Sequence, residues 1–157
     1  MPSRRNKIEM TPDELQAFLE NGYTLQVASN GPRGAPHLAA MWYSLDETGL
    51  IQFTTFTKSQ KIVNLQRDPH ITCMLEDGKA YSELRGLVVE GQAEVTIGDV
   101  DATLAVMARN PEKYGGGGPN AQQSSEDARR IAAKRCVVKV RPDKIYSWDH
   151  NKLSGVY

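Results

Sequence analysis

The sequence predicts a mainly β protein in which six or seven strands form an antiparallel sheet that closes into a barrel, with peripheral helices. After residue 22, apolar and polar residues alternate with a period of two, which is typical of strands with one buried face. The first four predicted strands follow one another as neighbours joined by short links. This order favours an antiparallel barrel over a fold built from β-α-β units.

The chain begins with a well-marked helix. Thr11-Pro12-Asp13-Glu14 combines an N-cap residue, a proline at the first helical position and a capping-box glutamate. Asn21-Gly22 is typical of a helix end. The sequence therefore predicts a helix over residues 11–21.

Period-two patterns predict the barrel strands within residues 23–97 and 136–149. The individual strands are expected at residues 23–29, 38–45, 50–56, 70–76, 84–97, 136–141 and 144–148. Gly91 within the fifth strand indicates a bulge or a tight bend, and Pro142-Asp143 is expected to separate the last two strands.

Helical patterns interrupt the strands at two places. A short helix is expected over residues 59–66, and residues 99–134 form a helical and loop insertion. Its first helix is capped by Asp99 and ends at Asn110-Pro111, and its second covers residues 126–134. The glycines at 115–118 form a loop that is either disordered or a mobile lid. No repeat or linker indicates a second domain, so residues 1–157 are expected to form one domain.

The composition argues against several classes of function. Lysine plus arginine equals aspartate plus glutamate at 19 each, so the net charge does not indicate a nucleic acid or an anionic membrane as partner. No apolar run approaches the roughly 20 residues that span a bilayer, and no secretory signal is evident. Cys73 and Cys136 are expected to be buried thiols, and no Cys or His spacing indicates a metal site. We expect a cytoplasmic protein.

Residues 53–69 carry the most informative pattern. A strand ends at Thr54-Thr55 and a helix begins near Ser59, with Lys58 and Lys61 on either side of that start. Lysines are unfavourable there because a helix N-terminus carries partial positive charge. A bound phosphate would reverse the sign by accepting hydrogen bonds from backbone N–H groups, hydroxyls and both ammonium groups. The pattern indicates either a phosphate site or two solvated lysines on a surface turn.

A second pattern, small residues followed by aromatic ones, lies on the strand expected beside Thr54. Ala39-Ala40 precede Met41 and Trp42. Small side chains let a flat ring approach the backbone, and Trp42 can form a wall of the pocket. The alternative is an ordinary barrel strand.

Residues 23–149 resemble the pyridoxamine-phosphate-oxidase-like superfamily, most specifically in the run from Thr54 to Pro69. Residues 89–95 and 144–149 are similar to its actinobacterial branch of deazaflavin-dependent oxidoreductases, which use coenzyme F-420. The resemblance implies a split β-barrel of the FMN-binding type. It also implies a homodimer that binds two cofactors at the subunit interface.

The resemblance assigns roles to individual residues. Ser59 and Lys61 correspond to phosphate-binding positions, and Thr54 and Thr55 to positions that line the ring and ribityl chain. The partner subunit is expected to supply Lys79-Ala80-Tyr81, with Trp148 nearby. The full cofactor-binding set implied is Met41, Trp42, Thr54, Thr55, Lys58, Ser59, Lys61, Asn64, Lys79, Ala80, Tyr81 and Trp148.

The implied activity is hydride transfer between reduced F-420 and a hydrophobic conjugated substrate of quinone, enone or tetrapyrrole type. The cofactor carries this chemistry, so no catalytic side chain is required. Gln60 stands where flavin-binding oxidases commonly place an arginine, which weakens the case for FMN. An FMN-dependent oxidase or reductase and a non-catalytic cofactor or haem binder are the alternatives.

Overall fold

A computed structural model describes residues 5–114 and 125–153 of the chain. Its seven strands form one antiparallel sheet in the order β2-β1-β5-β6-β7-β4-β3, which confirms the mainly β fold predicted from the sequence. The strands are β1 (Leu25–Asn30), β2 (Pro36–Met41), β3 (Ser44–Leu45), β4 (Ile51–Phe56), β5 (His70–Asp77), β6 (Arg85–Ile97) and β7 (Arg135–Asp149).

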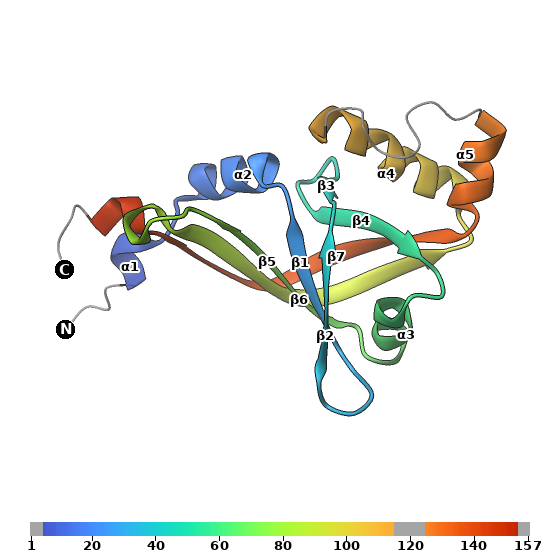
Figure 1. The fold of residues 1–157 in the computed structure, drawn as a ribbon, viewed down its shortest axis with the longest axis horizontal. Helices are drawn as coiled ribbons and strands as arrows, with labels where there is room; N and C mark the ends of the chain where they lie inside the picture. The colour runs from blue at the N-terminus through green and yellow to red at the C-terminus, as the bar shows by residue number, and fades with distance from the viewer. Residues whose placement is uncertain (1–4, 115–124, 154–157) are drawn as a thin grey trace.

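The sheet is curled in the manner of a barrel. The two edge strands, β2 and β3, lie at opposite ends of the strand order, yet only Trp42 and Tyr43 separate them in the chain. The sheet therefore has to bend until its two edges approach each other. Figure 1 shows the result, with β1 and β2 running across the long strands β5, β6 and β7.

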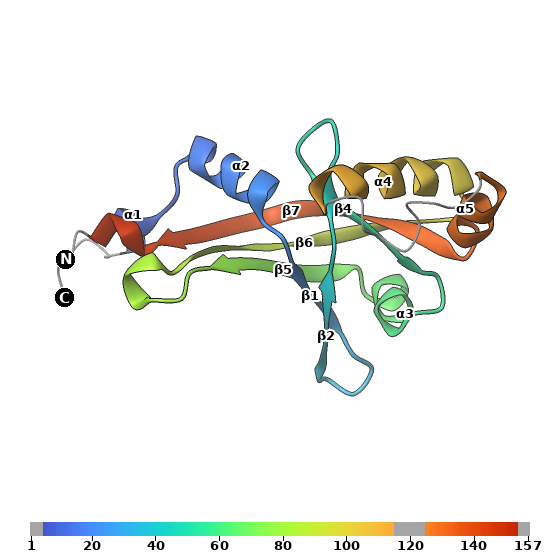
Figure 2. The ribbon, with the colours of Figure 1, turned by 45° about the horizontal axis from the view of Figure 1, so that its top comes forward.

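Helices cover the outside of the sheet. In both views α2 and α4 lie above the long strands and α3 lies below them (Figures 1 and 2). None of the helices in the described part of the chain is long and apolar enough to cross a membrane. The helices are α1 (Arg5–Ile8), α2 (Pro12–Asn21), α3 (Gln60–Arg67), α4 (Val100–Lys113) and α5 (Ser125–Ala132), with 3-10 turns η1 (Tyr81–Glu83) and η2 (His150–Leu153).

Local capping explains where two of the predicted helices begin. Thr11 Oγ1 accepts from the Glu14 backbone N–H at 3.3 Å, and Glu14 Oε2 accepts from the Thr11 N–H at 2.7 Å. Asp99 Oδ1 accepts from the Ala102 N–H at 2.8 Å. Both helix starts are therefore confirmed, and each satisfies backbone donors that a helix N-terminus leaves free.

The expected break between the last two strands is wrong. β7 runs without interruption past Pro142, because the sheet absorbs the proline in a bulge. Glu90 pairs with Lys144 and Gly91 with Pro142, so Asp143 is the extra residue on β7. A bulge is one of the few places where a sheet tolerates proline, and the bulge predicted at Gly91 is confirmed.

Two other boundaries differ from expectation. The strand predicted at 38–45 is divided into β2 and β3, because the chain crosses from one sheet edge to the other at Trp42-Tyr43. The expectation that its first part lies beside Thr54 is wrong: β2 pairs with β1, and only β3 pairs with β4. The helix expected to end at Asn110-Pro111 continues to Lys113. A proline in the last turn removes one backbone hydrogen bond, and contacts of Lys113 and Tyr114 with the barrel hold that turn. The short α1 was not predicted, and the glycines at 115–118 lie outside the described residues.

The core lies inside the curled sheet and under α2 and α3. Phe53, Leu87 and Val138 are fully buried on neighbouring strands, and Ile62 seals the core from α3. Cys73 and Cys136 are both buried and free, as predicted. This packing fixes α3, and with it the segment that the sequence singles out for chemistry.

Candidate functional site

Polar and cationic groups from three elements gather at the N-terminal end of α3. Thr54 and Thr55, at the end of β4, are 7% and 4% exposed. The Lys61 ammonium donates to Thr55 Oγ1 at 3.0 Å. Because Thr55 pairs with Cys136 and Phe56 with Arg135, the start of β7 lies directly beside this pair. The structure thus brings Thr55, Lys61 and Arg135 together.

Two hydrogen-bond donors in this region lack an acceptor. Ser59 is the N-cap residue of α3, but its hydroxyl makes no capping hydrogen bond. Ser59 Oγ and Arg135 Nε are buried atoms with no hydrogen-bond partner among the described residues. Buried polar atoms are nearly always hydrogen-bonded in folded proteins. A ligand that brought acceptor oxygens to the start of α3 would satisfy these donors.

The electrostatics point the same way. Burial lowers the pKa of Lys61, and the neighbouring Arg135 guanidinium lowers it further. Burial also lowers the pKa of Arg135, whose guanidinium stacks on the Phe56 ring at 4.4 Å. No carboxylate pairs with either cation within the described ranges. Two partly buried cations at a helix N-terminus match a phosphate group, which accepts several charge-assisted hydrogen bonds.

Arg135 is the functional candidate that sequence reasoning missed. In the sequence it is one of two adjacent basic residues between α5 and an apolar run. Only the register between β4 and β7 places it beside Phe56 and the turn that leads into α3. The Thr57 N–H donates to the Lys134 carbonyl at 3.1 Å, which fixes this turn against β7.

The other predicted phosphate-segment residues have different surroundings. Lys58 is exposed at the turn before α3. Asn64 is fully buried: its amide donates to Ser29 Oγ at 3.1 Å and accepts from Gln60 Nε2 at 2.9 Å. Asn64 therefore ties α3 to β1 in the interior.

Met41 and Trp42 lie where the chain passes between the sheet edges. Met41 packs against the core at the end of β2. Trp42 is 41% exposed, and its indole stacks on the Tyr114 ring with centroids 4.5 Å apart. An exposed, supported indole can form the wall for a planar ligand that the sequence suggested.

The remaining predicted residues lie at the other end of the molecule. The connection between β5 and β6, which contains Lys79, Ala80 and Tyr81, lies beside α1 and η2, far from α3 (Figures 1 and 2). All three residues are exposed. Trp148 lies across β6 at Gly86, where an added Cβ would come within 2.4 Å of the indole. Trp148 also lines a cavity of about 520 Å³ with Tyr146 and His150.

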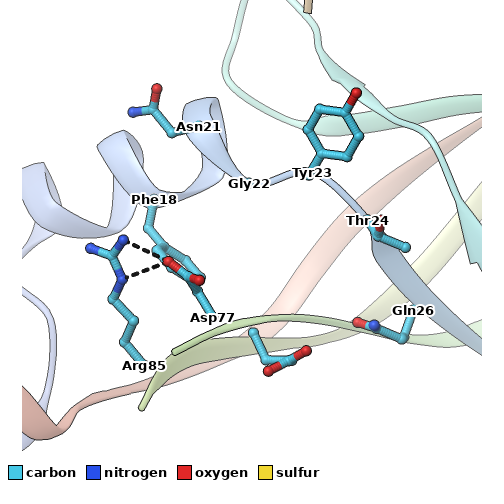
Figure 3. Close-up of a pocket in the computed structure, with 9 residues that line it drawn as sticks. Phe18, Asn21, Gly22, Tyr23, Thr24, Gln26, Asp77 and Arg85 are labelled. Atoms are coloured by element: carbon cyan, nitrogen blue, oxygen red, sulfur yellow. Dashed lines mark hydrogen bonds and ion pairs between the residues drawn. The ribbon is translucent and has the colours of Figure 1, made fainter. Parts of the chain in front are cut away.

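A separate cavity of about 300 Å³ lies between α2 and strands β1, β5 and β6 (Figure 3). Arg85 donates to Asp77 and stacks on Phe18. Its charge is thereby neutralised, and Glu76 and Gln26 add acceptor oxygens to the lining. This cavity contains none of the predicted cofactor residues, and its acceptors make it a poor phosphate site.

Several solved structures are similar to this chain over most of its length. The protein Rv2991 from Mycobacterium tuberculosis is 35% identical, with a TM-score of 0.84 over 99% of this chain and 94% of that one. An F420 reductase is 27% identical, with a TM-score of 0.65 over 83% of this chain and 94% of that one. The heme storage protein HutZ from Vibrio cholerae shares the fold at 16% identity, with a TM-score of 0.63 over 85% of this chain and 92% of that one. No curated protein matches the sequence.

The family assignment rests on nearly the whole chain. Residues 11–149 match the pyridoxamine 5'-phosphate oxidase family, and this range includes every strand of the sheet. The range also includes all twelve predicted cofactor-binding residues. The chain therefore belongs to the pyridoxamine 5'-phosphate oxidase family.

Proposed function

We propose that this chain is an oxidoreductase that uses coenzyme F-420 to reduce a hydrophobic conjugated substrate of quinone, enone or tetrapyrrole type. The observation that carries the proposal is the pair of unpartnered buried donors, Ser59 Oγ and Arg135 Nε, beside the Lys61 ammonium. These groups fit a phosphate-bearing cofactor. The similarity to an F420 reductase at 27% identity supports a deazaflavin over a flavin.

The residues of this chain have a defined task in such a reaction. Ser59, Lys61 and Arg135 would hold the cofactor phosphate, and Thr54 and Thr55 would line the chain that leads to the ring. Trp42 would support the ring on one side. When bound, the reduced cofactor supplies the hydride, while the protein orients it and excludes water.

We further propose that the protein acts as a homodimer in the cytoplasm and that each site uses both subunits. Lys79, Ala80, Tyr81 and Trp148 lie too far from α3 to join the site of their own chain. β7 separates Arg135 from Trp148 by about 40 Å of extended strand. A second copy can bring these residues to the ring.

The decisive experiment measures binding of oxidised F-420 and of FMN by fluorescence titration. We expect F-420 to bind more tightly than FMN. Lys61→Ala and Arg135→Ala should each weaken F-420 binding by about 10- to 100-fold, because each removes a charge-assisted hydrogen bond. Arg67→Ala is the matched control, since it removes the same charge from the other end of α3.

Each other outcome has a definite meaning. If FMN binds more tightly, FMN replaces F-420 as the proposed cofactor, and the proposed phosphate site is retained. Failure to bind either cofactor, or equal loss in Arg67→Ala and Lys61→Ala, contradicts the proposal. Haem titration would then test the carrier alternative.

A further inference from the structure

The indole of Trp42 stacks on a residue from outside the sheet. It lies in the two-residue link between β2 and β3, outside the strands themselves. The Tyr114 ring stacks on its indole at 4.5 Å with an angle of 9° between the planes. This stack covers part of the indole, while 41% of the residue stays exposed.

Tyr114 is itself held from several directions. The residue is 6% exposed, and its ring meets the Tyr23 ring edge-on at 4.8 Å. Its hydroxyl accepts from the Tyr43 N–H at 3.0 Å and donates to the Tyr23 carbonyl at 2.9 Å. Burial raises the pKa of Tyr114, so the phenol keeps the proton that it donates.

These contacts join the end of α4 to two links of the barrel. The Lys113 ammonium lies 3.5 Å from the centre of the Tyr43 ring and 3.5 Å from the Leu19 carbonyl oxygen. Tyr43, fully buried, hydrogen-bonds to that same carbonyl through its hydroxyl. The Trp42 indole therefore stacks on a residue that directly follows α4, although α4 contributes no predicted cofactor residue.

We infer that Tyr114 is a positioning residue that fixes the indole of Trp42 against the cofactor ring. The inference rests on the proposed function, because it requires a planar cofactor at Trp42. A stacked aromatic pair is worth a few-fold in binding when it pre-orders the contact surface. Tyr114 would thus act on cofactor affinity only through Trp42, and removing either partner should remove the same advantage.

The test is a double-mutant cycle on the equilibrium affinity for oxidised F-420. We expect Tyr114→Leu and Trp42→Leu each to weaken binding by about 2- to 10-fold. The double variant should bind no more weakly than Trp42→Leu alone. If Tyr114→Leu does not fold, Tyr114→Met serves in its place, because its flexible side chain fills the buried site and also removes the ring that stacks on Trp42.

A control on the same helix separates positioning from general destabilisation. Val106 is buried on α4 and lies about 12 Å along the helix from Tyr114. Val106→Ala should lower the midpoint of urea unfolding and leave F-420 affinity unchanged.

Three results overturn the inference: an unchanged affinity in the Tyr114 variant, an equal loss in Val106→Ala, or additive losses in the double variant. These failures are distinct from that of the proposed function, which shows as wild-type protein that binds neither F-420 nor FMN. In that case the positioning role fails with it.

Discussion

Lys61 and Arg135 are a pair of cations that would favour binding of an anion but lower the stability of the unliganded protein. Both are partly buried, burial lowers the pKa of each, and the Arg135 guanidinium lowers the pKa of Lys61 further. Burying a cation without a counter-charge is unfavourable, so these residues stabilise little in the protein alone. An anion at the start of α3 would remove that penalty, which is the arrangement expected of a binding site.

Asp46 represents the opposite case, a buried charge that is fully satisfied. It is 8% exposed, and its carboxylate accepts from Lys139 at 2.6 Å and from the Leu50 N–H at 3.0 Å. Burial alone would raise the pKa of Asp46. The hydrogen bonds from Lys139, Thr48 and Leu50 outweigh burial and hold that pKa well below its usual range. The ionised carboxylate therefore fastens the link between β3 and β4 to β7.

We expect Asp46→Asn to lower the free energy of unfolding by about 1–3 kcal/mol at pH 7, because it removes a charged acceptor from buried donors. A lowered folded-state pKa stabilises the protein above the unfolded value of about 4, and this contribution is lost as the pH falls further. Urea unfolding of both proteins from pH 7 to pH 3 measures the difference. A gap between the two proteins that widens on acidification would contradict this assignment.

At the scale of elements, the bulge between β6 and β7 decides which side chains point to which face. After it, Gly86 lies opposite Trp148, so that the indole lies across the glycine. A shift of one residue in β7 would turn its last residues to the opposite face. The bulge depends on Gly91, where an added Cβ would lie 2.0 Å from the Arg141 carbonyl oxygen.

Gly91→Ala should therefore destabilise the protein strongly, by about 2–4 kcal/mol, because the obstructing atom is backbone and cannot turn away. Gly98→Ala is the matched control. Gly98 follows β6 with φ +84° and has no atom within 4 Å of the added Cβ. Gly98→Ala should lower the free energy of unfolding by only about 1 kcal/mol, because of backbone strain. Equal losses in urea unfolding would show that the close approach at Gly91 is unimportant.

Most elements could be predicted from the sequence because their signals are local. The capping box at Thr11 and the period-two pattern of β6 each lie within a few neighbouring residues. What the sequence could not show depends on pairing between distant segments. The continuity of β7 through Pro142 follows from its register with Gly91, and the split at Trp42-Tyr43 follows from closure of the sheet.

The candidate site also has residues that local sequence predicts and residues that it does not. Ser59 and Lys61 were evident because strand, turn and helix lie in one continuous segment. Arg135 reaches them across the β4–β7 ladder, and Tyr114 reaches Trp42 from the end of α4. Neither contact can be predicted from the residues that are neighbours in the sequence.

At the scale of the whole molecule, the shape separates two groups of predicted site residues. β6 and β7 are 13 and 15 residues long, so their paired ends are about 40 Å apart. Lys61 and Arg135 lie near one end, where Ile97 pairs with Cys136. Trp148 lies at the other end. If both groups act in one site, they come from two chains.

Subunit mixing tests this arrangement directly. Lys61→Ala and Trp148→Ala should each weaken F-420 binding as homodimers. When the two variants are refolded together in equal amounts, half of the dimers contain one chain of each variant. Each such dimer has one intact site and one site that lacks both side chains. About a quarter of the sites should then bind F-420 with wild-type affinity.

The matched control mixes wild-type chains with chains that carry both substitutions. When sites are shared between subunits, this mixture also retains about a quarter of its sites, since only the wild-type homodimers have intact ones. When each chain forms its own site, the first mixture has no intact sites and the control retains about half. Titration of the two mixtures, with dimer mass measured by light scattering, therefore distinguishes the arrangements. A monomeric mass, or a first mixture without tight sites, would require each chain to bind its cofactor alone.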